Sequence, residues 1–339
     1  MLSQTNQTFG EIDSMTIYYG FEKMKENLRK LIELAEKLSK IMPNVYYLAR
    51  EWTPVKLILL MHYVHLYYNI MKKQRKYSRI IYIDPLAGAG INKIETTGDI
   101  IAGSPIISVV FSEKSFHQYL FAEADERSRN ALKKRLQSLP LTQFEVKIDC
   151  NELLDYVSSL LAKEDKPTHY LLFVDCEGIE IRWQSMEKIL SFPGDLIFVF
   201  QTVEIWEQIT RWKKHKSVTA FFGNEDWVNI KERDQLVALY KKNIKSVPIR
   251  SSGKTRELIY SIPIRGKING NTYYYDIIFA AEKTMRGSPW FSNFRNHAEK
   301  IAKWTGKEIK QALHILTGRS TQIDWFTPGD ILDRYFGVG

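Results

Sequence analysis

Apolar residues recur with two different periods along this chain, and the period predicts which segments are helices and which are strands. Up to about residue 75 they return every three or four positions, which predicts an amphipathic helix over Gly20–Ile41. Thr53-Pro54 reads as a helix cap followed by a proline at the first helical position. A second helix is therefore expected from there to about Lys73, packed on the structure that follows.

From residue 80 onward, short runs of β-branched and aromatic residues alternate with helical segments. The predicted strands are 80–84, 119–123, 144–148, 170–175 and 195–201. The predicted helices between them are 104–112, 126–138, 151–161 and 184–190. The stretch from Leu86 to Gly103 is predicted to be a loop. This alternation predicts a parallel sheet with right-handed helical crossovers.

The pattern changes after the fifth strand. Residues 203–250 look helical, with a cap at Asn224, and two strands at 257–264 and 272–281 flank a predicted turn at Arg265–Asn271. Helix is expected again over Trp290–Leu316. Five parallel strands followed by an antiparallel hairpin is the order of the class I methyltransferase fold. We therefore predict an α/β, Rossmann-like fold of that class, with N-terminal helices and helical insertions.

These changes of pattern suggest three regions. Residues 1–75 form an N-terminal helical segment, and residues 76–282 form the methyltransferase-like α/β domain, with its helical insertion at about 203–250. Residues 283–339 form a C-terminal helical extension. The 339 residues are 44% hydrophobic and 26% charged, as in ordinary soluble proteins. The apolar stretch Ile58–Met71 is too short and too polar to span a bilayer.

Composition also bears on compartment and partner. Two cysteines cannot build a disulfide framework, and residues 1–14 show no signal-peptide pattern, so a cytoplasmic location is expected. The net charge is +9, yet residues 201–319 carry 22 Lys and Arg against 11 Asp and Glu. That excess of +11 leaves −2 for the rest of the chain. We expect an anionic partner, with nucleic acid favoured over a merely solvated lysine-rich surface.

A cluster in this basic region interleaves cations with aromatic rings. The predicted nucleic-acid-binding residues are Arg211, Lys213, Lys214 and Lys216, which lie among Trp206, Trp212 and Trp227. Such a surface can neutralise phosphates and stack bases. The alternative is an amphipathic helix whose tryptophans belong to the core. The loop 286–290 is a further candidate for reading substrate.

The strongest chemical signal is the end of the first predicted strand. Asp84 is followed by a small-residue loop containing Gly88 and Gly90. Glycine can adopt positive φ and has no Cβ to block a ligand, and parallel sheets bind ligands at the carboxyl ends of their strands. Three further strands end in Glu123, Asp149 and Asp175. These four acids are expected to converge on one edge of the sheet.

The spacing of this loop argues against a dinucleotide. The third glycine of G-x-G-x-x-G is absent, and Glu123 lies 33 residues beyond Gly90 rather than about 20. We expect S-adenosylmethionine (SAM) instead, with the loop facing the methionine portion, the second-strand acid on the ribose and the third-strand acid on the adenine. The predicted cofactor-binding residues are Asp84, Leu86, Gly88, Gly90, Glu123 and Asp149.

Each acid also has a purely structural interpretation. Asp84 could cap a turn, Glu123 lies beside a helix start that favours acids, and Asp149 could cap the next helix. Ser104 is interpreted as a helix cap rather than a ligand.

The fourth strand ends where an acceptor would meet a methyl group. Asp175 and Glu177 are therefore the predicted catalytic residues. The Pro-Pro-aromatic tripeptide of amino-methylating enzymes does not occur here, and Cys176 is an alternative nucleophile. His62 and His65 share a helix face, which is interpreted as packing, so no metal is expected.

These motifs together resemble the three-Cys-motif partner (TcmP) protein family. The similar segments, with Trp52–Leu57 upstream of them, are Ile83-Asp-Pro-Leu-Ala-Gly-Ala-Gly90, Gly103-Ser-Pro105, Phe121-Ala-Glu-Ala-Asp125 and Phe173-Val-Asp-Cys-Glu-Gly178. The resemblance covers roughly residues 45–280. It implies a methyltransferase-like fold and a genomic association with a cysteine-rich partner, without an established reaction. Here Asp-Cys-Glu-Gly replaces the family's usual Asp-Pro-aromatic-Gly.

The sequence thus predicts a SAM-binding, methyltransferase-like protein that acts on nucleic acid, in DNA modification, repair or defence. One alternative is a non-catalytic nucleic-acid-binding module with the same fold. The other is a metal-dependent nuclease built on the clustered carboxylates with magnesium.

Overall fold

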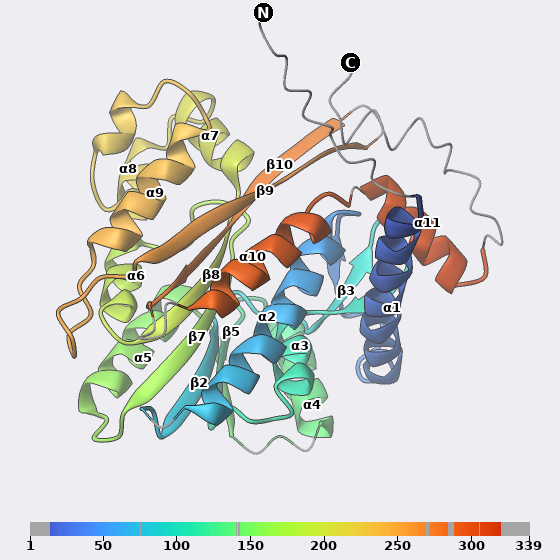
Figure 1. The fold of residues 1–339 in the computed structure, drawn as a ribbon, viewed down its shortest axis with the longest axis horizontal. Helices are drawn as coiled ribbons and strands as arrows, with labels where there is room; N and C mark the ends of the chain where they lie inside the picture. The colour runs from blue at the N-terminus through green and yellow to red at the C-terminus, as the bar shows by residue number, and fades with distance from the viewer. Residues whose placement is uncertain are drawn as a thin grey trace, which may run out of the picture.

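The computed structural model describes residues 14–319, apart from 75, 140, 142, 269–270, 284–287 and 305. The side chains of residues 14–19, 267–268 and 271–272 are outside this description as well. In this part of the chain a seven-stranded sheet with helices on both faces forms the centre of the molecule (Figure 1). In order along the sheet, its strands are β6 (Phe144–Lys147), β5 (Gln118–Ala122), β2 (Arg79–Asp84), β7 (Thr168–Asp175), β8 (Gly194–Phe200), β10 (Asn271–Ala281) and β9 (Leu258–Ile268).

The direction of these strands confirms the predicted fold class. β2 runs parallel to both β5 and β7, β5 is parallel to β6, and β7 is parallel to β8. Only β10, among the described strands of this sheet, runs against its neighbours β8 and β9. The chain therefore builds a doubly wound parallel sheet and completes it with an antiparallel hairpin.

Successive side chains of each strand enter two separate cores. In β2, Ile80 and Tyr82 belong to one hydrophobic cluster and Ile81 and Ile83 to the other, as the two-residue period of a strand requires. All four are buried, which explains why the strand reads as a continuous apolar run. We name the two faces of the sheet the α2 face and the α5 face after helices that cover them.

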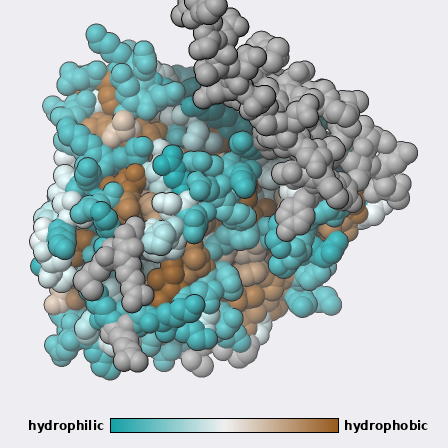
Figure 2. Space-filling view, viewed as in Figure 1, coloured by the Kyte–Doolittle hydropathy of each residue, from teal (hydrophilic) through white to brown (hydrophobic). Residues whose placement is uncertain are grey.

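The helices divide between these faces according to their buried residues. The α2 face is covered by α1 (Ser14–Ser39), α2 (Thr53–Lys73), α3 (Ser104–Phe111), α4 (Glu126–Ser138), α10 (Pro289–Ile301) and α11 (Gly306–Leu316). The α5 face is covered by α5 (Cys150–Lys163), α6 (Trp183–Leu190), α7 (Thr202–Thr210), α8 (His215–Phe222) and α9 (Gln235–Ser246), with the short 3₁₀ helix η1 (Asp226–Asn229). Figure 2 shows that hydrophilic residues cover most of the viewed surface, with hydrophobic ones gathered in its lower centre.

A small second sheet lies where the sequence predicted only a loop. It joins β1 (Tyr47–Ala49), β3 (Ile91–Ile94) and β4 (Ile100–Ala102). Ile91, Ile94 and Ile101 are buried, and β3 and β4 lie against α1. The loop prediction for 86–103 was wrong because strands of three or four residues are too short for a period to be recognised in the sequence.

The predicted antiparallel hairpin is confirmed, but its strands extend into the turn predicted at Arg265–Asn271. Arg265 pairs with Tyr274 and Gly266 with Tyr273, so both strands continue to residues 268 and 271. A Cβ placed on Gly266 would lie 2.2 Å from the Tyr273 hydroxyl. Gly266 therefore leaves room for the Tyr273 ring on the neighbouring strand. In the sequence, a glycine with this packing role cannot be distinguished from a glycine in a turn.

Several helix ends differ from the prediction. α1 begins at Ser14 rather than Gly20, and the helix expected over Trp290–Leu316 is divided into α10 and α11. Thr53 and Ser104 are first helical residues rather than caps, since Trp52 and Gly103 hold the capping positions. Asn224 accepts the Asp226 backbone N–H at 3.0 Å between α8 and η1.

The proposed division at residues 75 and 282 remains an interpretation, because α1, α2, α10 and α11 all share the core of the α2 face. Among the residues described here, no helix combines the length and hydropathy needed to cross a membrane.

Candidate functional site

The loop after β2 is held open by glycine conformation and by backbone hydrogen bonds. Gly88 has φ +62° and Gly90 has φ +80°, values that glycine adopts readily. The Ala87 N–H donates to the Ala122 carbonyl and the Gly103 N–H to the Gly90 carbonyl, both at 2.9 Å. A Cβ at Gly88 would meet nothing within 4 Å, whereas one at Gly90 would meet Ile106 and Leu132. A side chain at position 88 would therefore point into open space. Position 90 must be glycine because Ile106 and Leu132 pack against it.

Asp84 lies directly under this loop and is completely buried. Its Oδ1 accepts the Leu86 N–H at 3.2 Å, whereas its Oδ2 has no hydrogen-bond partner among the described residues. Desolvation raises the pKa of Asp84 to about 7, partly opposed by the Ser104 hydroxyl and the Leu86 N–H. A buried carboxyl with one free oxygen can accept a hydrogen bond from a ligand.

Three of the predicted acids lie on the same face of the sheet. Tyr82, Phe121 and Phe173 are all in the core of the α2 face, so Asp84, Glu123 and Asp175, each two residues further along, point toward that face too. Asp175 and Glu123 both contribute to raising the pKa of Asp84, which places the three carboxyls within electrostatic reach. The predicted convergence of these acids is therefore present in the structure.

Glu123 continues the ladder of β5 beyond its last assigned residue. Its N–H donates to the Lys147 carbonyl at 3.1 Å, and its Oε1 accepts the Asp125 N–H at 2.8 Å. Arg129 donates to the Glu123 carbonyl at 2.8 Å and braces this turn. The side chain is half-buried, and its Oε2 has no hydrogen bond to another described residue.

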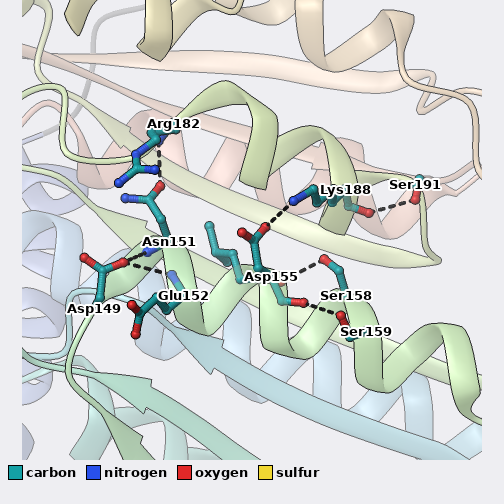
Figure 3. Close-up of polar contacts among 10 residues, drawn as sticks. Asp149, Asn151, Glu152, Asp155, Ser158, Ser159, Arg182, Lys188 and Ser191 are labelled. Atoms are coloured by element: carbon teal, nitrogen blue, oxygen red, sulfur yellow. Dashed lines mark hydrogen bonds and ion pairs between the residues drawn. The ribbon is translucent and has the colours of Figure 1, made fainter.

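Asp149 has a visible structural role. Its Oδ1 accepts the N–H groups of Asn151 and Glu152, both at 2.8 Å, so it caps α5 (Figure 3). This is the alternative that the sequence left open, and a cofactor role for Asp149 remains a prediction. The preceding residue, Ile148, is 60% exposed. An apolar side chain therefore lies open to solvent beside the capping acid.

At the end of β7 the structure shows a partner that the sequence reasoning missed. Lys56, in the first turns of α2, places its Nζ 2.8 Å from Oδ1 and 2.6 Å from Oδ2 of Asp175. Both side chains are less than one-fifth exposed. Asp175 is therefore half of an ion pair rather than a lone carboxylate. The available signal in the sequence was the Trp52–Leu57 segment. It resembles the TcmP family, but that resemblance assigns no role to Lys56.

Aromatic residues from the hairpin adjoin this pair. The Trp52 ring stacks on Tyr273 at 4.2 Å between ring centroids, with 14° between their planes. The Tyr275 hydroxyl donates to the Trp52 carbonyl at 3.4 Å. The start of α2 is thus fixed against β10, four residues from Lys56.

The other predicted acceptor-side residues differ in environment. Glu177 is exposed, and its pKa is raised by partial desolvation and by Glu180 and Glu204. Cys176 is 1% exposed, and burial raises its thiol pKa well above the usual value. Since the thiolate is the reactive form, this environment disfavours Cys176 as a nucleophile.

A buried arginine braces the glycine loop from behind. Arg135 of α4 is 1% exposed and donates to the Ala89 carbonyl at 2.7 Å and to the Val45 carbonyl at 2.8 Å. It also donates to the carbonyls of Ile41 and Met42. Burial lowers its pKa to about 10, so it stays charged at neutral pH. No local signal marked Arg135, because it lies in a helix dense in cations.

The predicted basic cluster lies at the corner between α7 and α8. The Arg211 side chain is 68% exposed and lies 5.0 Å over the Trp212 ring, which is itself 53% exposed. Lys213, Lys214 and Lys216 are exposed as well. Trp227 is buried and donates to Thr219, so the interleaved tryptophans divide between core and surface.

The histidine pair has structural partners. His62 contacts Asn27 at 3.1 Å and packs edge-on against His297, and burial lowers the pKa of His62 to about 4. The His65 ring contacts Asn69 at 3.1 Å. Within the described residues, no group of three or more His, Cys, Asp or Glu side chains is arranged to hold a metal ion.

Solved structures of methyltransferases are similar to this chain, although their sequence identity to it is low. No family model and no curated protein matches this sequence. The solved structures similar to it include the O-methyltransferase TomG of Streptomyces achromogenes in complex with SAM, at 10% identity and TM-score 0.38 over 79% of this chain and 96% of that chain. Another is an O-methyltransferase from Bacillus cereus in complex with SAH, at 11% identity and TM-score 0.34 over 75% and 100%.

An rRNA methylase from Streptococcus thermophilus is also similar, at 12% identity and TM-score 0.33 over 65% of this chain and 93% of that chain. At these scores the similarity adds no argument beyond the strand order of the chain itself. The resemblance to the TcmP family therefore remains a sequence-based prediction.

Proposed function

We propose that this protein binds SAM at the carboxyl ends of β2, β5 and β6 and acts as a methyltransferase. The observation that carries this proposal is Asp84, a fully buried carboxyl with a free oxygen beneath a glycine loop that is open at Gly88. A ligand with a cationic amino group would meet both features. When bound, SAM supplies an activated methyl group.

The surrounding residues fit the other parts of this cofactor. Gly88, Gly90 and Leu86 would line the methionine portion, and Glu123 would accept hydrogen bonds from the ribose hydroxyls. The remaining oxygen of Asp149 would meet the adenine amino group. Ile148, exposed beside it, offers the apolar contact that a purine ring would cover.

The Lys56–Asp175 pair supplies the acceptor side. A carboxylate neutralised by a lysine can accept a hydrogen bond from an acceptor N–H or O–H group and hold it in line for methyl transfer. Lys56 pairs with both oxygens of Asp175 and fixes the orientation of its carboxyl group. Glu177, further out and partly desolvated, would contact the portion of the acceptor nearer solvent.

Nucleic acid is the proposed carrier of the acceptor atom, in DNA modification, repair or defence. The support is the +11 excess over residues 201–319 and the exposed Arg211–Trp212 stack beside Lys213, Lys214 and Lys216. The resemblance to three-Cys-motif partner proteins adds a cysteine-rich protein as a second partner, in the cytoplasm.

Calorimetry with the full chain tests the cofactor proposal directly. We expect SAM and SAH to bind with one-to-one stoichiometry and NAD to show no heat of binding. Binding of NAD, or of neither compound, would overturn the assignment of the glycine loop.

One observation favours the non-catalytic alternative. Asp175 is already paired with Lys56, so its carboxylate is less available to an acceptor. A protein that binds SAM yet transfers no methyl group to plasmid DNA or transcribed RNA would match that alternative.

A further inference from the structure

An open groove of about 400 Å³ lies between α9 and β9, on the face of the sheet opposite Asp84. Figure 1 shows α9 beside the β9–β10 hairpin, and β9 is the edge strand of the sheet. The residues that line the groove are Ala238, Lys241, Lys242, Lys245, Ser246 and Ile259. It is therefore a basic surface separate from the proposed cofactor site.

The lysines of the groove follow the helical period of α9. Ala238, Lys241, Lys242 and Lys245 are spaced i, i+3, i+4 and i+7, which places them on one side of the helix. The other side, which includes Tyr240, is buried in the core of the α5 face. Like charges at this spacing disfavour the helix, so the arrangement is not explained by the stability of α9.

Little of this charge is neutralised by neighbouring acids. The Lys242 Nζ lies 3.4 Å from Asp226, and both of these side chains are more than half exposed. Lys241 donates to the Ser261 hydroxyl of β9 at 3.1 Å, which compensates no charge. No hydrogen bond or ion pair joins Lys245 to another described residue. Three lysines therefore line the groove together with the apolar residues Ala238 and Ile259.

A peptide strand that extends the sheet would be the other occupant of such an edge. β9 contains Pro263, which lacks a backbone donor, and Arg265, a cation on the edge. Both are devices that discourage strand addition. The lysines are on α9 rather than on β9, so protection of the edge does not require them.

We infer that the α9–β9 groove binds the phosphate backbone of a nucleic acid. The lysines neutralise consecutive phosphates, and the apolar lining residues contact the sugar. This inference deepens the proposed function by giving its nucleic-acid partner a second contact surface, and it rests on that partner but not on the cofactor site.

The test is a salt titration of oligonucleotide binding by the full chain, measured by fluorescence anisotropy with a labelled 20-nucleotide single strand and its duplex. The triple variant Lys241→Gln, Lys242→Gln, Lys245→Gln is compared with a matched control, Lys37→Gln, Lys134→Gln, Lys163→Gln, which alters three exposed helical lysines elsewhere. We expect about a tenfold or greater loss of duplex affinity at low salt in the groove variant. Its log–log salt slope should fall by roughly 2 to 3, at about 0.9 for each phosphate that the variant no longer neutralises.

Besides a parent protein that binds no oligonucleotide, three results would overturn the inference. They are an unchanged slope in the groove variant, an equal loss in the control variant, and competition by poly-glutamate as strong as that by unlabelled oligonucleotide. The last result would assign the groove to an acidic protein. SAM calorimetry on the groove variant reports folding independently. If the parent protein binds SAM but no oligonucleotide, this inference fails while the cofactor proposal stands.

Discussion

Two buried aspartates, one at the carboxyl ends of the strands and one at the amino ends, show why burial alone does not identify a functional site. Asp84 ends β2 and Asp195 lies at the start of β8, and both are almost fully buried on the α2 face. Desolvation raises the pKa of each to about 7. They differ in their partners, since Asp195 accepts from the Tyr63 hydroxyl at 3.0 Å and has His169 at 3.9 Å, whereas Asp84 accepts the Leu86 N–H and its Oδ2 has no hydrogen-bond partner among the described residues.

Asp195 is surrounded by buried polar side chains. His169 lies 3.9 Å from Asp195 and contacts the Tyr67 hydroxyl at 2.8 Å, and burial lowers the pKa of His169 to about 3. Arg256, fully buried nearby, donates to three backbone carbonyls and to the Tyr170 hydroxyl. The Asp195 carboxyl is thus packed among side chains of α2 and β7 and is interpreted as structural, whereas the Asp84 carboxyl has an oxygen left for a ligand. The following predictions separate these two roles.

The largest expected effect is on stability, near Asp195. Arg256→Met should reduce the free energy of unfolding by about 3–5 kcal/mol, because several buried acceptors lose their donor together. Urea denaturation followed by circular dichroism measures this. Arg250→Met, an exposed arginine nearby, is the control and should change stability by less than about 0.5 kcal/mol. Equal effects in both variants would refute a structural role specific to Arg256.

At the carboxyl ends of the strands the expected loss is in turnover. Asp175→Asn should leave SAM affinity intact and lower methyl transfer by roughly 10²–10⁴, the usual contribution of a positioned acid–base group. Transfer from tritium-labelled SAM to unmethylated plasmid DNA and to transcribed RNA measures it, with Asp165→Asn, an exposed acid, as control. Full activity in Asp175→Asn would move the acceptor assignment to Glu177 and to the 286–290 segment, of which residues 286 and 287 lie outside the described residues and residues 289 and 290 begin α10.

Glu123→Ala should weaken SAM binding by about 1.5–3 kcal/mol, the range for a hydrogen bond to a charged group. Calorimetry compares it with Glu126→Ala, an exposed glutamate in the first turn of the neighbouring helix. If the two variants bind equally well, the acid at the end of β5 does not hold the ribose.

The smallest expected effect, taken over one pH unit, is a change in how the free energy of unfolding varies with pH. A carboxyl whose pKa is raised on folding binds its proton more tightly in the folded state, so its contribution is complete below about pH 4 and is lost as the pH rises through about 7. Asp84→Asn and Asp195→Asn should each flatten the fall in stability between about pH 4 and 7, by at most about 1.4 kcal/mol per pH unit. Only Asp84→Asn should also weaken SAM binding. If Asp195→Asn also lost SAM binding, the assignment of SAM binding to Asp84 and of a structural role to Asp195 would be refuted.

The sequence by itself determined the strand order and the placement of the acids. Buried parallel strands read as short apolar runs, and the residue that follows each run is at the carboxyl edge whatever the details of packing. Asp84, Glu123 and Asp175 could therefore be predicted together on that edge. The glycine loop could be recognised for the same local reason, since positive φ at Gly88 and Gly90 requires glycine.

Only the tertiary structure decided what these groups contact. Lys56 meets Asp175 across 119 residues of sequence, and Arg135 reaches the carbonyl of Ala89 across 46. Both contacts depend on how α2 and α4 lie on the sheet, and no periodicity encodes that placement. Asp84 and Asp195 also could not be distinguished beforehand, because a free or a satisfied carboxylate oxygen is a property of packing, not of the local sequence.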